Sequence, residues 1–162
     1  MKPSPVQLLK QFAEFIPYVE ALARYGNELW DRPLQEGKWT VQQIIAHILL
    51  WDQYFYEQAI RYLGTGASLP LKHLDFDEFN KQAVVFSHQH GKEDIVRLAM
   101  EYRQRIVDRI GQLTEEDYHV PYVDRDGNGF TVYEYLIGFV PHDNHHMQQI
   151  EQCLEAARRS TV

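Results

Sequence analysis

Apolar side chains recur at the spacing of an α-helix over four long stretches of this chain, and no other feature restricts its fold as much. The stretches comprise residues 5–29, 40–63, 93–113 and 132–158. A helix with one apolar face must bury that face against another element, and no segment of the chain alternates convincingly as a strand would. The pattern therefore predicts an all-α protein built as a four-helix bundle.

The segments between these stretches carry the signals of turns. Asp, Pro and Gly residues place a loop at 30–39, and Gly64-Thr65-Gly66 ends the second helix. A short helix is expected over 77–88, and a small hairpin or turn within 122–130. Pro17 is expected to bend or shorten the first helix. The connections on either side of the third long helix exceed what a simple up-down bundle needs, which is typical of a crossover or of a site.

The composition limits the molecules that this protein is expected to bind and the compartment in which it is expected to lie. The chain has 162 residues, which fits a single domain over 1–162, and its net charge is 16 − 23 = −7. An acidic surface repels phosphate groups, so nucleic acids and anionic membranes are poor partners. The first residues lack the apolar core of a signal peptide, and no apolar run approaches the roughly 18 residues of a membrane span. Cys153 is the only cysteine, so no disulfide can form within the chain, and we expect a soluble, cytoplasmic protein.

Three histidines lie close together near the end of the chain, at positions 142, 145 and 146. On a helix, His142 and His146 are about 40° apart around the axis and about 6 Å apart along it, so both rings can reach one ion. His145 lies about 100° from His146, so these two cannot easily share a metal, although His142 and His145 form a second geometric pair. Neutral imidazole suits zinc, nickel, copper and iron. The competing interpretation is a solvated polar face, or histidines bonded to the backbone.

A further histidine, His47, stands in the middle of the apolar run Ile44–Leu50. Burying an imidazole there without a partner is costly. A hydrogen bond is the more common solution for a lone histidine, but a metal shared with His142 and His146 would satisfy all three rings. Three histidine ligands leave at least one coordination position open, which is typical of catalytic rather than structural metal sites.

The residues around these histidines resemble a known family. Residues 37–48, Gly-Lys-Trp-Thr-Val-Gln-Gln-Ile-Ile-Ala-His-Ile, are similar to the DinB-like (YfiT-like) superfamily pattern of Trp, Ser or Thr, then Glu or Gln, then His before an aliphatic residue. His142-x3-His146 followed by Gln149-Ile150 is similar to the second half of that pattern. The resemblance covers nearly the whole chain. It implies an up-down-down-up four-helix bundle, and a divalent metal held by His47, His142 and His146.

For activity, the resemblance implies one of two chemistries. Family members with a known role include transferases and isomerases that use low-molecular-weight thiols, and many others are described as metal-dependent hydrolases. The resemblance therefore implies a small-molecule substrate, one divalent metal (Zn, Ni, Mn or Fe) and, for a transferase, a thiol. Gln43 stands where the family often has Glu. The change is harmless if this side chain only caps the helix, but it removes a base if the Glu acts as one.

The residues alone do not identify a catalytic base. Tyr54, Asp143 and His145 are the nearest candidates by sequence, and each is weak. Asp143 or Gln149 is instead a candidate for orienting a ligand imidazole. The alternative interpretation of the whole chain is a non-catalytic helical bundle that carries no metal, or a merely structural one. A homodimer is expected as the assembly.

A second metal motif is present only in part. Asp124-Arg125-Asp126-Gly127-Asn128-Gly129 matches the opening of an EF-hand calcium loop. Such a loop closes with a bidentate Glu, but Tyr135 stands at that position in this chain. Pro121 also argues against a helix that enters the loop. We therefore expect a tight turn that leads to Thr131, which has the capping-box spacing with Glu134.

Overall fold

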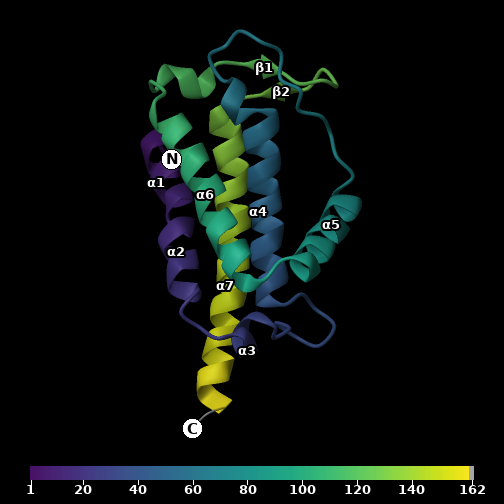
Figure 1. Cartoon of the computed structure of the whole chain (residues 1–162). Coiled ribbons are helices and arrows are strands. Elements are labelled where there is room, and N and C mark those ends of the chain that lie inside the picture. The colour runs from purple at the N-terminus through teal and green to yellow at the C-terminus, as the bar shows by residue number, and fades with distance from the viewer. Residues whose placement is uncertain (161–162) are drawn as a thin grey trace.

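The computed structural model describes residues 1–160 and contains the predicted four-helix bundle (Figure 1). The helices are α1 (Pro5–Ala13), α2 (Phe15–Leu22), α3 (Asn27–Trp30), α4 (Val41–Gln58), α5 (Phe76–Gln89), α6 (Lys92–Gly111) and α7 (Val132–Ser160). Short 3-10 turns lie at Ile60–Tyr62 and Glu116–His119, and β1 (Tyr122–Val123) pairs with β2 (Gly129–Phe130) in the predicted hairpin. The segment α1–α2 forms the first bundle helix, and α4, α6 and α7 form the other three.

The helices follow the up-down-down-up order, seen inverted in Figure 1. There the α1–α2 segment runs downward, α4 and α6 both run upward, and α7 runs downward. Because α4 and α6 are parallel neighbours, the chain must return between them. The connection after α4 and then α5 make this return beside α4, outside the four bundle helices. This crossover accounts for the long segment between the second and third predicted helices.

The first predicted helix, residues 5–29, is broken into three pieces. α1 ends at Ala13, and α2 begins at Phe15. In an unbroken helix, Pro17 would lack an N–H for the carbonyl of Ala13 and its ring would clash with that carbonyl. The break therefore falls one turn before the proline, which then occupies the first turn of α2, where proline is tolerated. The sequence predicted that Pro17 would bend or shorten this helix, but the helical range predicted for it, residues 5–29, was too long.

α4 begins where its capping residues predict. The Thr40 hydroxyl accepts a hydrogen bond from the backbone N–H of Gln43, and the Gln43 side chain accepts one from the backbone N–H of Thr40. Gln43 therefore acts as a helix cap. The side chains from Ile44 to Leu49 are all buried, because α4 packs against both α5 and α6. The helix ends at Gln58 rather than near Leu63, and a 3-10 turn follows it.

The hairpin turn uses the carboxylates of the partial calcium motif. Asp124 Oδ1 accepts hydrogen bonds from the backbone N–H groups of Asp126 and Asn128, at 2.9 and 2.8 Å. Asp126 Oδ2 accepts one from the backbone N–H of His73 at 2.7 Å. These carboxylates thus hold a tight turn and tie it to the connection that precedes α5, as the tight-turn interpretation predicts.

A buried polar layer divides the core of the bundle. Apolar side chains form one cluster towards each end of the bundle. Between the two clusters, α4 carries buried Asp52, α6 carries buried Arg103 and α7 carries buried Asp143. His47 is buried close to this layer on α4. None of the helices within residues 1–160 has both the length and the apolar character needed to cross a membrane.

Candidate metal centre

His47 of α4 and His142 and His146 of α7 come together inside the bundle. One ring nitrogen from each lies within 4.8 Å of the others. The Nε2 atoms of His47 and His142 are 3.2 Å apart. Two nitrogens bound to one tetrahedral zinc at about 2.05 Å each would be about 3.3 Å apart, so this spacing fits two ligands of a single ion. The three histidines selected from the sequence are therefore within reach of one metal.

Two of these rings are oriented by a side-chain oxygen. Nδ1 of His142 lies 3.0 Å from Oδ1 of Asp143, and Nδ1 of His146 lies 3.0 Å from Oε1 of Gln149. An oxygen at Nδ1 favours a proton there, which leaves the lone pair on Nε2 free to bind a metal. Asp143 and Gln149 thus occupy the orienting positions that the sequence offered as an alternative to catalysis.

A buried arginine anchors this arrangement from inside the bundle. Arg103 of α6 donates to Asp52 from Nε and Nη2, at 2.7 and 3.0 Å, and to Asp143 from Nη2 at 2.7 Å. It also donates from Nη1 to the carbonyl of Phe12, at 2.9 Å. Arg103 and Asp52 are each 1% exposed and Asp143 is 3% exposed. One guanidinium thus joins α1, α4, α6 and α7, and fixes the carboxylate that holds His142.

The electrostatics of this network keep Asp143 in its ionised form. Burial acts to raise the pKa of Asp143, but the neighbouring Arg103 and His142 outweigh it and hold the pKa below its ordinary value. Burial raises the pKa of Asp52 to about 6, although Arg103 acts against this shift. An ionised Asp143 is the stronger acceptor for the Nδ1 proton of His142.

Sequence reasoning missed Arg103 and Asp52. A signal was present, because Arg103 stands at the helical spacing of the buried residues Ala99, Ile106 and Ile110. A charged residue on an otherwise apolar stripe is almost never buried without a partner. The partner lies on another helix, however, and the spacing along one helix does not reveal it.

Burial also favours the neutral form of His47 and His146. It lowers the pKa of His47 to about 3, with further contributions from His146 and His142. The pKa of His146 is also lowered, chiefly by burial. A histidine binds a metal only when the ligating nitrogen is unprotonated, so both rings stay competent at a pH where a free imidazole, with a pKa of about 6.5, becomes charged.

The metal-free protein should lose stability as the pH falls below about 6.5. Between the ordinary pKa and the lower pKa of the folded state, the unfolded chain binds more protons at His47, so acid lowers the free energy of unfolding. One such group contributes at most about 1.4 kcal/mol per pH unit. Urea unfolding between about pH 7 and about pH 5 should show a flatter dependence for His47→Gln than for the wild type. Equal slopes would show that His47 is not held neutral.

Two other candidates stand apart from this cluster. The His145 side chain is exposed and is not part of the three-histidine cluster, although its ring lies 5.8 Å from that of His146. The Tyr54 hydroxyl donates to the backbone carbonyl of Lys72 at 2.8 Å. Its ring packs against Trp51 rather than against a histidine. Of the three residues proposed as weak catalytic candidates, only Asp143 touches the cluster.

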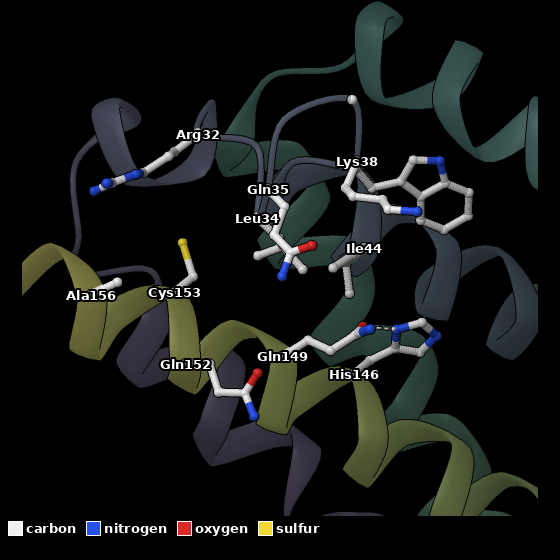
Figure 2. Close-up of a pocket in the computed structure, with 12 residues that line it drawn as sticks. Arg32, Leu34, Gln35, Lys38, Ile44, His146, Gln149, Gln152, Cys153 and Ala156 are labelled. Atoms are coloured by element: carbon white, nitrogen blue, oxygen red, sulfur yellow. Dashed lines mark hydrogen bonds between the residues drawn. The ribbon is translucent and has the colours of Figure 1, made fainter.

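A groove of about 710 Å³ opens beside the cluster, between α7 and the loop that precedes α4 (Figure 2). His146 and Gln149 lie at one end of it, joined by their hydrogen bond, and Cys153 lies further along α7. The loop contributes Arg32 and Lys38. A ligand in this groove would therefore lie next to one of the three histidines.

The fold and the cluster together define a class of protein, the helical bundle with three converging histidines and an adjoining groove. The sequence model of the DinB superfamily matches residues 7–150, and the chain belongs to this superfamily. The family resemblance drawn from the two histidine motifs is thus confirmed. No match was found among curated proteins.

Two solved structures share the fold. YfiT from Bacillus subtilis, described as a probable metal-dependent hydrolase with an unusual four-helix bundle topology, matches with a TM-score of 0.73 and 19% identity, over 99% of this chain and 94% of that one. The mycothiol-dependent maleylpyruvate isomerase matches with a TM-score of 0.64 and 15% identity, over 91% of this chain and 58% of that longer one. At these identities the likeness shows the fold alone.

Proposed function

We propose that this protein is a metal-dependent enzyme that binds one divalent transition metal through His47, His142 and His146. The supporting observation is the convergence of three ring nitrogens within 4.8 Å. Three protein ligands leave a coordination position open, as in catalytic sites. The side chain of His142 is 32% exposed, so the site is accessible from solvent. A divalent ion here supplies Lewis-acid chemistry, which lowers the pKa of a bound thiol or water towards neutral.

The residues of the chain orient the ligands and pack around the ring of His47. Asp143 and Gln149 hold two of the rings, and Arg103 keeps Asp143 ionised. Around the third ring, the centroids of Trp39 and Trp51 lie 5.1 and 6.5 Å from that of His47. Trp51 is buried, whereas Trp39 also lines the groove in which we expect the substrate to lie.

Transfer of a low-molecular-weight thiol is the reaction this site supports best. Within residues 1–160, Asp143 is the carboxylate that hydrogen-bonds to one of the three histidines, His142, and its two oxygens are taken by His142 and Arg103. Neither oxygen of Asp143 is free to act as a general base. A thiol, with an ordinary pKa of about 8.5, loses its proton far more readily than water, so it needs such a base less. The structural similarity to YfiT, named as a probable hydrolase, favours metal-dependent hydrolysis as the second candidate.

Elemental analysis followed by two assays tests this proposal. The first assay offers a small thiol and an activated aryl halide, and the second offers an activated ester without thiol. Turnover that requires both metal and thiol supports the transferase, and turnover that requires metal but no thiol supports the hydrolase. A protein that takes up no divalent metal would contradict both and favour the non-catalytic bundle.

The groove predicts a preference for anionic thiols. Arg32 and Lys38 line it, and none of the described residues that line it is acidic. The double variant Arg32→Gln, Lys38→Gln should raise KM for mercaptosuccinate about 10-fold, since a hydrogen bond to a charged group contributes about 1.5 kcal/mol or more. KM for uncharged 2-mercaptoethanol should not change. Lys81→Gln, which removes an exposed charge on α5 outside this groove, is the matched control. An equal rise in KM for both thiols would contradict charge recognition.

A further inference from the structure

Two buried side-chain atoms among residues 1–160 lack a hydrogen-bond partner, and they are Nδ1 of His47 and Oδ1 of Asn80. Buried polar atoms are nearly always paired, so each of these calls for an explanation. The first can donate when it carries a proton, and the second can only accept. Asn80 lies on α5, which packs against α4, the helix that carries His47. Its side chain is also close enough to oppose part of the lowering of the His47 pKa that burial causes. The two unpaired atoms therefore lie on contacting helices and have complementary roles.

The helix that carries Asn80 is docked against α4 at two points. Phe79 packs on Trp51, with 4.0 Å between the ring centroids. Gln42 Nε2 donates to the backbone carbonyl of Ser87 at 2.9 Å. The part of α4 between these two points contains His47, so α5 lies over the back of the metal cluster.

Asn80 lies on the face of α5 that is turned towards α4. Ala83 and Ser87, which follow it at helical spacing, are both buried, and the preceding Phe79 makes the aromatic contact described above. The amide of Asn80 is thereby directed into the bundle rather than to solvent, and its oxygen is fully buried.

The other two histidines show what His47 requires. In His142 and His146, Nδ1 faces an oxygen at 3.0 Å, supplied by Asp143 and Gln149. With an oxygen at the Nδ1 of His47 as well, all three rings would carry the proton on Nδ1 and direct an Nε2 lone pair to the same position. Two such lone pairs, 3.2 Å apart in His47 and His142, repel each other unless a cation lies between them.

We propose that Asn80 is a positioning residue of the metal centre, and that its side-chain oxygen accepts the Nδ1 proton of His47 and so directs Nε2 of that ring to the ion. This inference rests on the metal site of the proposed function, but it holds whether the reaction is transfer or hydrolysis. It makes the crossover helix α5 part of the site, although α5 supplies none of the three histidines.

Zinc affinity, measured by competition with a chromophoric chelator, tests this role. Asn80→Leu keeps the approximate size of the side chain and removes the acceptor, and it should weaken zinc binding about 10- to 100-fold. Asn80→Asp keeps an acceptor and should retain or tighten the binding. Gln82→Leu makes a similar change at an exposed position of α5 and should leave the affinity unchanged. Wild-type affinity in Asn80→Leu, or equal losses in Asn80→Leu and Asn80→Asp, would overturn the proposal.

A second measurement separates orientation of the ring from packing of the helix. At saturating zinc, the Nδ1–H resonance of His47 should exchange slowly with solvent in the wild type and in Asn80→Asp, and faster in Asn80→Leu. A purely structural role for Asn80 would change the melting temperature of the metal-free protein but not this exchange, and that result would also overturn the proposal. A wild type that binds no zinc defeats both this inference and the proposed function. A wild type that binds zinc with the expected variant pattern, but catalyses neither reaction, defeats only the proposed activity.

Discussion

Replacement of His47, His142 or His146 by Ala is expected to abolish tight metal binding while the helical fold persists. Each ring supplies one of three nitrogens that lie within 4.8 Å of each other, so each loss leaves only two protein ligands. The effect on affinity should exceed the roughly 10- to 100-fold loss that follows removal of an orienting partner. Elemental analysis after dialysis measures metal content, and far-UV circular dichroism checks the fold.

His145→Ala is the matched control for this series. It removes the same side chain from the same helix, next to His146, but from an exposed position outside the cluster. Full metal content is expected in this variant. Loss of metal in His145→Ala together with retention in His146→Ala would show that the pair at i, i+3 binds the ion. Retention in all four variants would favour the non-catalytic bundle.

Arg103→Met is expected to lower the free energy of unfolding by about 3–5 kcal/mol. The substitution leaves Asp52 and Asp143 buried beside each other with no compensating cation. Arg97→Met, on the same helix, is the control. Arg97 makes ion pairs with Asp94 and Glu101 at an exposed position, so its loss should cost about 0.5 kcal/mol or less. Chemical denaturation of the four-helix domain measures both values.

Arg103→Lys provides a milder version of the same test. A lysine keeps the charge, but its single ammonium group cannot reproduce the paired contact with Asp52 and the bond to Asp143 together. We expect an intermediate loss of stability and weaker metal binding, since Asp143 orients His142. A loss below about 1 kcal/mol in Arg103→Met would show that the network is not the anchor of the bundle.

The sequence predicted the parts of this protein that depend on local spacing. Helical periodicity defined the four long helices, and the Thr40 capping box located the start of α4. The interval between His142 and His146 placed two rings on one face of α7, and the apolar surroundings of His47 singled out a third. The sequence predicted that Pro17 bends or shortens the first helix but did not locate the break, which falls after Ala13 because Pro17 acts on a carbonyl one turn earlier.

The features that sequence reasoning missed depend on contacts between helices. Arg103 contacts two carboxylates from two other helices, and no spacing along a single helix encodes that meeting. Asn80 lies on the short helix of the crossover, which the sequence analysis did not connect to the histidines. The groove likewise forms only where the loop before α4 lies over α7. The homodimer expected from the sequence stays a prediction.

The buried charged layer also determines how the helices align along their long axes. Apolar faces tolerate sliding, because one aliphatic contact can replace another. A shift of α7 by one turn would move Asp143 about 5.4 Å, out of reach of Arg103, and would strand both charges in the core. The layer thus fixes the position of α7 along its axis. Because His142 is next to Asp143, its position is fixed as well. In the proposed metal site the three nitrogens are thus already in register, so we expect the folded protein to take up and exchange metal without any helix having to move.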